Sequence, residues 1–249
     1  MTQSVGNSAP AGASPVFATT HWSMVLRAGE VTSEARDQAL STLCDLYWYP
    51  LYVFVRRRGY SGHDAEDLTQ GFFAQLLRRQ DIRGVDARRG RFRSYLLAAL
   101  KHYVANDWKR QNRQKRGGGC EVLSFDAETA EAKYAKEVAS ESAERSYDRS
   151  WALALLNRAI SRLREQYAKK GKADLYSAME PFLSTSTENE SYTQIAEDFD
   201  MTESAVKMAV SRMRKRYGGA IREEIAGTVE DPEQVEDELK ALFEALRQG

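Results

Sequence analysis

The chain has 249 residues, of which 42% are hydrophobic and 29% are charged, and its 36 basic residues equal its 36 acidic ones in number. These values are typical of a soluble globular protein, and no stretch approaches the roughly 18 apolar residues that cross a membrane. Because a typical domain has roughly 100 to 200 residues, the length favours two small domains over one.

The N-terminal segment and the cysteines bear on where the protein works. Residues 1–20 are rich in Gly, Pro, Ser, Ala and Thr and lack the basic and apolar parts of a secretion signal, so a disordered tail is predicted. Cys44 and Cys120 are the only cysteines, which leaves no disulfide framework and no zinc-binding spacing. We therefore expect a cytoplasmic protein that has no membrane partner and needs neither a metal nor another cofactor.

Charge is segregated along the chain although its sum is zero. Residues 56–116 contain 16 Lys and Arg against 6 Asp and Glu, and residues 207–217 contain 5 basic residues and no acid. Residues 121–149 carry 8 acids against 4 bases, and residues 223–249 carry 9 against 2. Two basic zones that alternate with acidic segments predict two contacts with a polyanion such as DNA.

Apolar residues recur three or four positions apart along almost the whole chain, and strand-like alternation is missing, so an all-α fold with two small helical domains is predicted. The first domain, residues 21–116, is expected to contain helices near residues 21–28, 37–58, 64–79 and 92–113, with a basic loop at 81–90. Residues 117–147 are acidic and poor in large apolar side chains, which predicts a solvated linker with some helical character.

The second domain, residues 148–226, carries a helix-turn-helix pattern. Ser191 to Gln194 match a capping box at the start of a short helix. Residues 200–202 form a three-residue turn, and Thr202 is expected to be the N-cap of a longer helix. Residues 227–249 are predicted to form an acidic amphipathic helix that packs on the second domain or masks it.

The helix-turn-helix predicts duplex DNA binding. Its second helix enters the major groove, where polar side chains reach base edges and cations contact phosphates. A plain three-helix bundle with a solvated basic face is the structural alternative, but the capping box, the turn length and five bases without an acid favour DNA. The outward residues are Ser204, Lys207, Ser211, Arg212 and Lys215.

The first domain offers a second DNA-contacting surface. Cations that hold a DNA backbone beside aromatic rings that stack on bases are typical of single-stranded DNA binding. Aromatic residues at helical spacing are also typical of a core, so Tyr103 and Trp108 are expected to be buried. The cations singled out in the long helix and in the loop before it are Arg88, Arg89, Arg91, Arg93, Lys101, Lys109 and Arg110.

Two stretches make a resemblance to a known family specific. Residues 47–116, which include DAEDLTQGFF at 64–73, resemble region 2 of extracytoplasmic-function (ECF) sigma factors of the sigma-70 family. Residues 191–217, SYTQIAEDFDMTESAVKMAVSRMRKRY, resemble region 4 of the same factors. Because both motifs occur in the expected order, the resemblance covers most of the chain.

The resemblance implies a non-enzymatic subunit that directs core RNA polymerase to promoters. The polymerase partners would be the clamp helices of the largest subunit and the flap of the second largest. The residues that dock on the clamp helices would be Asp64, Glu66, Asp67 and Gln70. The distal (−35) promoter element would be read as duplex by the outward residues of the helix-turn-helix. The proximal (−10) element would be recognised and melted by Arg88, Arg91, Arg93, Ser94, Tyr95, Lys101, Asn106, Asp107, Lys109 and Arg110.

The resemblance also bears on regulation. The acidic linker is similar to the segment that occupies the polymerase active channel and RNA exit path by mimicking nucleic-acid charge. An anti-sigma factor and a kinase are candidate regulators, the latter through phosphorylation of Thr69 beside the docking acids. Gly71 stands where the family usually has an acid and Ala209 where it often has Arg, which leaves docking strength and promoter sequence open.

Two other classes of protein are alternatives. A stand-alone helix-turn-helix regulator would bind duplex DNA without polymerase, but it leaves the docking acids and the basic aromatic helix without a role. A recombinase or nuclease would need a catalytic cluster, which His21, His63 and His102 do not form, and the sequence lacks a Gly-rich phosphate loop and paired metal-binding carboxylates. No catalytic residue and no metal ligand is therefore predicted.

Overall fold

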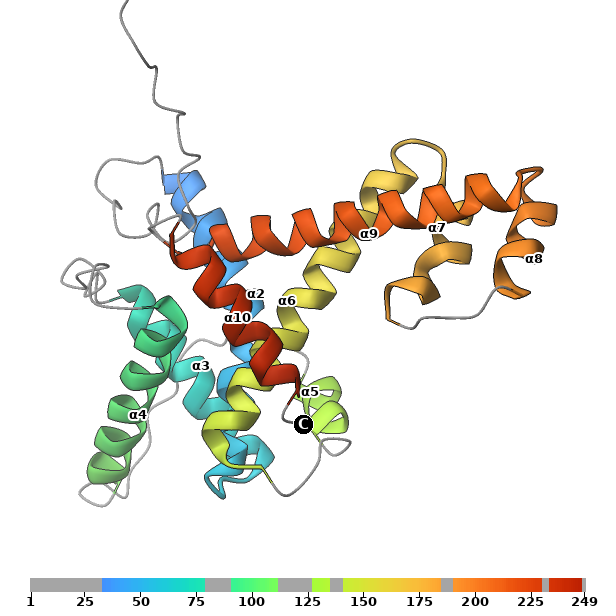
Figure 1. Ribbon diagram of the computed structural model, residues 1–249. Coiled ribbons are helices and arrows are strands. Elements are labelled where there is room, and N and C mark those ends of the chain that lie inside the picture. The colour runs from blue at the N-terminus through green and yellow to red at the C-terminus, as the bar shows by residue number, and fades with distance from the viewer. Residues whose placement is uncertain are drawn as a thin grey trace, which may run out of the picture.

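The computed structural model describes residues 33–78, 91–111, 127–134, 141–184, 190–229 and 233–247. Every regular element in these ranges is a helix, which confirms the predicted all-α fold (Figure 1). The helices are α2 (Ser33–Arg57), α3 (Gly62–Arg78), α4 (Phe92–Gln111), α5 (Ala127–Tyr134), α6 (Ala143–Ala168), α7 (Ala173–Met179), η3 (Glu180–Leu183), α8 (Glu190–Asp198), α9 (Glu203–Ala226) and α10 (Gln234–Arg247). The tail at 1–20, the helix predicted at 21–28 and the loop at 81–90 with Arg88 lie outside the described residues.

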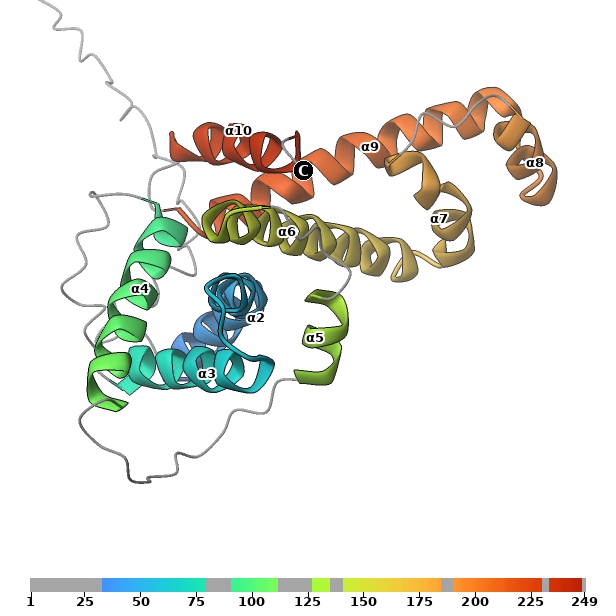
Figure 2. The ribbon, with the colours of Figure 1, turned by 90° about the horizontal axis from the view of Figure 1, so that it is seen from below.

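Helix α2 is the centre of a first hydrophobic core. Its residues 50–55 are all buried, and a helix that is buried on all sides belongs to the interior of a fold. Figure 2 shows α2 nearly end-on, with α3, α4, α5 and α6 arranged around it. The start of α6, the end of α9 and one face of α10 complete this core through residues such as Trp151, Ile225 and Leu242.

A second core lies at the other end of α9, where α7, η3 and α8 pack against it (Figure 1). It is built from Leu163 and Tyr167 at the end of α6, Phe182 in η3, and Val206 and Met213 on α9. Since α9 also contributes to the first core through Ile221 and Ile225, the same helix joins the two cores.

Helix α6 also belongs to both cores. The sequence placed an acidic linker up to residue 147 and a separate domain from 148, whereas α6 begins at Ala143 and buries Tyr147 and Trp151 in the first core. Large aromatic side chains remove so much apolar surface from water that they dominate the packing of the helix that carries them. The domain limits stay a prediction, but no solvated linker separates these two cores at residue 147.

The turn of the helix-turn-helix has the geometry that its sequence predicts. Thr202 is the N-cap of α9, with its hydroxyl accepting from the Ala205 amide at 3.2 Å, as expected. Asp200 has a left-handed φ of 49°, and the Met201 amide donates to the Ala196 carbonyl at 2.8 Å. This pair of features is the Schellman ending of a helix, which reverses the chain in few residues.

The start of α8 differs from its predicted capping box. The helix begins at Glu190, so Ser191 lies inside it and is not its N-cap. The Gln194 side chain donates forward to Asp198 at 2.9 Å, where the capping box would have it reach back to the Ser191 amide. An i, i+4 pair along one helix face satisfies Gln194 without a capping role.

Helix α5, within the acidic segment 121–149, is docked on the first core by charge. Glu131 accepts hydrogen bonds from the Tyr52 hydroxyl and from Arg56 Nε, the latter at 3.0 Å. These two donors hold the pKa of Glu131 below its usual range. The Tyr134 ring lies 4.6 Å from the Arg56 guanidinium, so the pairing is both ionic and aromatic.

Gly71 allows α3 and α4 to approach each other closely. A Cβ at this position would lie 2.4 Å from the Tyr103 hydroxyl oxygen, and the Tyr103 ring packs edge-on against Phe72 at 5.8 Å between centroids. Tyr103 is half-buried, in keeping with its predicted place in the packing of the first domain. The absence of an acid at this position is therefore explained by helix packing.

We expect Gly71→Ala to lower the free energy of unfolding by about 1 to 3 kcal/mol, because the new methyl group displaces Tyr103 from Phe72. Gly218→Ala is the matched control: it lies in α9 with nothing within 4 Å of its would-be Cβ. The control should be neutral or gain about 0.5 to 1 kcal/mol from helix propensity. Urea unfolding measures both, and equal stabilities of the two variants would contradict this packing.

Candidate nucleic-acid interface

Two arginines at the start of α4 meet acids from distant parts of the chain. Arg93 Nε lies 2.9 Å from Glu238 Oε2 of α10, and Arg93 Nη1 pairs with Asp148 of α6. Arg91 Nε lies 2.8 Å from Glu238 Oε1, an ion-pair contact without the angle of a hydrogen bond. We call Arg91, Arg93, Asp148 and Glu238 the arginine cluster.

Arg93 is held on several sides at once. Its side chain is 11% exposed, and its guanidinium lies 4.7 Å from the Trp151 ring. Burial alone would lower the pKa of Arg93, but the facing carboxylates of Glu238 and Asp148 raise it overall, so the guanidinium is firmly charged. Burial also raises the pKa of Tyr147, whose hydroxyl stays protonated and donates to the Arg93 carbonyl at 2.9 Å.

The other predicted residues of the first basic zone spread along α4. Ser94 and Asn106 are exposed, Asp107 is half-buried, and the Tyr95 ring stacks on Phe92. Lys101 pairs with Glu144 of α6 at 2.9 Å. Lys109 and Arg110 lie in α4, but their side chains, like that of Trp108, are outside the described part of the structure.

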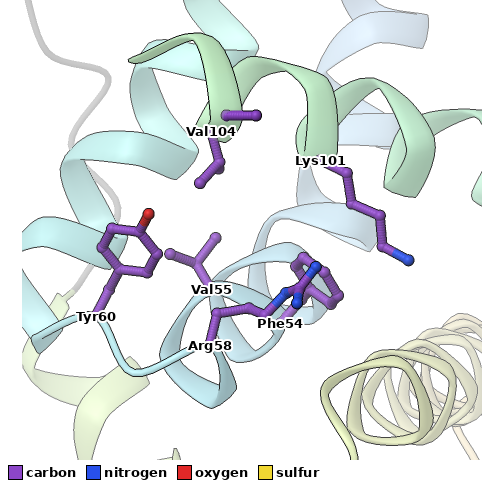
Figure 3. A pocket seen from close by; sticks show the side chains of 7 residues that line it. Phe54, Val55, Arg58, Tyr60, Lys101 and Val104 are labelled. Carbon is purple, nitrogen blue, oxygen red and sulfur yellow. The ribbon is translucent and has the colours of Figure 1, made fainter. Parts of the chain in front are cut away.

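A hollow of about 340 Å³ opens between the end of α2 and the middle of α4. Figure 3 shows Lys101 and Val104 extending from α4 beside the part of α2 that carries Phe54 and Val55. The Arg58 guanidinium lies 5.2 Å and the Lys101 ammonium 5.5 Å from the Phe54 ring centroid. The hollow therefore combines an apolar floor with a cationic rim, which suits an unstacked base and its phosphate.

The acids predicted for docking lie on the accessible side of α3. Ser61 accepts from the Asp64 amide at 3.1 Å and donates to the Asp64 carboxylate at 2.6 Å, which fixes the start of the helix. Asp67 is 65% exposed, and Gln70 donates to Glu66 at 2.9 Å. Asp64, Glu66, Asp67 and Gln70 are thus all within reach of a partner along one helix.

The prediction that Thr69 is a phosphorylation site is wrong, because Thr69 is buried. Its side chain is fully buried, and its hydroxyl donates to the Ala65 carbonyl at 2.7 Å inside α3. A kinase needs an accessible hydroxyl, whereas helical periodicity turns Thr69 inward between the outward Asp67 and Gln70. Thr69 is therefore a core residue of this helix.

The five outward residues predicted on α9 are all exposed: Ser204, Lys207, Ser211, Arg212 and Lys215. Lys207 Nζ lies 3.9 Å from Glu203 and 5.7 Å from the Tyr192 ring, both within the helix-turn-helix. An exposed i, i+4 pair of this kind contributes only about 0.3 to 0.5 kcal/mol, so a phosphate could readily compete for Lys207.

Sequence reasoning missed three cations beside this face. Lys170 and Lys172 from the corner between α6 and α7 line a hollow of about 130 Å³ together with Arg212 and Arg216 of α9, and its described lining contains no acid. Gly171 has a φ of 66°, which bends the chain so that both lysines border the hollow. The run Lys169-Lys170-Gly171-Lys172 was the signal in the sequence that could have found them.

None of the described helices has the length and apolar character that spanning a membrane requires. Among the described residues, no three His, Cys, Asp or Glu side chains gather in a way that could hold a metal ion.

Residues 49–114 match the family model described as Sigma-70 region 2. The chain is similar to this family over these residues, which are less than half of its length. The match runs from the second half of α2 to just beyond α4, and so includes the acids of α3, Arg91 and Arg93. Comparisons with curated proteins and with solved structures gave no match.

We expect Lys172→Ala and Arg216→Ala each to weaken binding of nonspecific duplex DNA and to reduce the slope of log K against log salt by about 1, because each removes one phosphate contact. Lys240→Ala is the control, since Lys240 is likewise an exposed cation but lies on α10, where it pairs with Asp237. Fluorescence anisotropy at several salt concentrations gives both quantities. A slope that is equally reduced by the control would show that only total charge matters.

Proposed function

We propose that this chain is an ECF-type sigma factor, which binds core RNA polymerase and directs it to promoters without catalysing a reaction itself. The observation that carries this proposal is the match of residues 49–114 to Sigma-70 region 2, because the matched helices hold both the acidic face of α3 and the cations of α4. A stand-alone regulator has no use for this pair of surfaces.

In this proposal α3 is the polymerase-docking helix. Asp64, Glu66, Asp67 and Gln70 would meet basic residues of the clamp helices of the largest subunit. Exposed acids attract a basic partner over a distance and exclude acidic ones, so they contribute more to association rate and specificity than to affinity. The accessible position of Asp67 supports this role.

The proximal promoter element is assigned to α4 and the hollow beside it. Melting a duplex leaves bases that need an apolar or aromatic surface and phosphates that need cations. The hollow lined by Phe54, Arg58 and Lys101 offers both kinds of group. Arg91 and Arg93 lie at the start of α4 and would hold the strand backbone once Glu238 of α10 moves away.

The distal promoter element is assigned to the outward face of α9. Ser204, Lys207 and Ser211 lie in the first half of the helix, which is the part that a helix-turn-helix places in the major groove. Lys170, Lys172 and Arg216 flank this face and would contact phosphates on either side of the groove. The part of the predicted acidic linker 117–147 that precedes α6 would follow the polymerase channel, which requires α5 to leave Arg56 and Tyr52.

We expect the purified full-length chain to bind core RNA polymerase and to start transcription in vitro at a defined subset of sites on genomic DNA. Asp67→Lys should weaken polymerase binding by at least about tenfold, as charge reversal opposes a basic partner. Glu165→Lys, a reversal at an exposed position of α6, is the control and should bind normally.

Copurification and mapping of transcript start sites are the two readouts. A chain that binds duplex DNA but neither associates with core polymerase nor changes its start sites would be a stand-alone helix-turn-helix regulator. Normal binding by Asp67→Lys together with normal initiation would instead remove α3 as the docking surface.

A further inference from the structure

Glu238 is buried, although it belongs to the acidic C-terminal segment, residues 223–249. Its side chain is 2% exposed, and its carboxylate bridges Arg91 and Arg93 of α4. Both arginines belong to the stretch that matches Sigma-70 region 2, while Glu238 lies far beyond it in sequence. The sequence predicted that the C-terminal helix would pack on or mask the second domain, residues 148–226. Helix α10 does pack on α6 and α9 of that range, but its buried acid faces the first basic zone.

Helix α10 is held in this position by apolar packing as well as by charge. Leu242 is fully buried, and Val235, Leu239 and Leu246 pack against the first core. At the N-terminal end of the helix, Arg222 of α9 pairs with Glu236 at 3.0 Å. The apolar stripe sets the register of α10, and this register points Glu238 at the two arginines.

A carboxylate and a DNA phosphate use the same faces of a guanidinium. Both groups present two anionic oxygens that can accept paired hydrogen bonds from one arginine. Arg91 and Arg93 therefore cannot hold Glu238 and a strand phosphate in the same way at the same time. If a strand phosphate binds Arg91 and Arg93, Glu238 is left as a buried unpaired charge, which is strongly unfavourable.

We propose that α10 is an intramolecular competitor of promoter DNA, in which Glu238 occupies the place of a strand phosphate on Arg91 and Arg93. This inference rests on the proposed function, because it takes these arginines as contacts of the melted strand. Binding of the strand and release of α10 are coupled, since the displaced Glu238 must regain water. The free chain is thereby kept from binding single-stranded DNA before polymerase engages it.

The expected change in affinity for single-stranded DNA follows from the fraction of molecules in which α10 is docked. If α10 is docked in about nine molecules of ten, the apparent affinity for a strand is about tenfold lower than that of the open form. Removing the charge of Glu238 should recover this factor. Removing an equal charge from the same helix without touching the arginines should not.

The test measures the affinity of the full-length chain for a fluorescent single-stranded DNA oligonucleotide. Glu238→Gln should bind about tenfold more tightly than the natural chain. Asp237→Asn is the matched control, since it also removes one carboxylate charge from the same helix, but at an exposed residue whose ion pair, to Lys240 at 3.3 Å, lies within α10. Equal affinities of Glu238→Gln and the natural chain, or an equal gain in both variants, would overturn the proposal.

A second variant, Leu246→Lys, keeps the proposal testable if Glu238→Gln does not fold. Leu246→Lys alters a half-buried position near the end of α10 and leaves the carboxylate of Glu238 in place. It should also raise strand affinity, because it loosens the helix that presents the acid. If circular dichroism shows that Glu238→Gln is unfolded, Leu246→Lys decides the question alone, and an unchanged affinity then overturns the proposal.

Arg91→Ala in the Leu246→Lys background separates the two levels of inference. Loss of the gained affinity would show that the strand contacts Arg91, as the proposed function requires. A tight-binding Leu246→Lys that is insensitive to Arg91→Ala would contradict both the strand contact and the competition. Weaker binding on Arg91→Ala, combined with no gain from Leu246→Lys or Glu238→Gln, would overturn only the competition by α10.

Discussion

The packing of α6 against α2 is the interaction on which the rest of the structure depends. Trp151 is fully buried in the first core and carries the Arg93 guanidinium over its ring, while Leu163 and Tyr167 on the same helix enter the second core. Truncating a buried aromatic side chain of this size typically costs about 3 to 5 kcal/mol. Because α6 and α9 both run from one core to the other, they fix the helix-turn-helix relative to α4.

This arrangement brings the acidic segments of the chain onto its first basic zone. Glu131 pairs with Arg56, Glu144 with Lys101, and Glu238 with Arg91. Each of these acids comes from residues 121–149 or 223–249, and each cation comes from residues 56–116. By contrast, Lys207 on the outward face of α9 pairs with Glu203, one turn earlier on the same helix. A net charge of zero thus conceals one basic surface that the chain covers itself and one that stays accessible.

Local sequence signals predicted several features that local interactions decide, although not the start of α8, where a capping box at Ser191 was expected. The helical periods, the N-cap at Thr202 and the outward face of α9 could all be read from spacing, because backbone geometry alone sets them. The burial of Arg93 could not, since it depends on Asp148 and Glu238, which lie 55 and 145 residues away. Thr69 was wrongly predicted to be accessible because its neighbours in sequence are acidic, whereas the helical period places its own side chain on the buried face of α3. The lysines beside Gly171 were missed because only the fold brings them next to Arg216.

Hydrogen exchange of the α10 amides, residues 234–247, tests most directly whether the free chain is closed at Arg91 and Arg93. The measurement compares the chain alone, the chain bound to core RNA polymerase, and the complex with promoter DNA. We expect slow exchange in the chain alone and markedly faster exchange once promoter DNA is bound, because Glu238 and the apolar stripe then leave α4 and α6. Fast exchange in the free chain, or equal protection in all three states while transcription proceeds, would contradict a closed and displaceable α10.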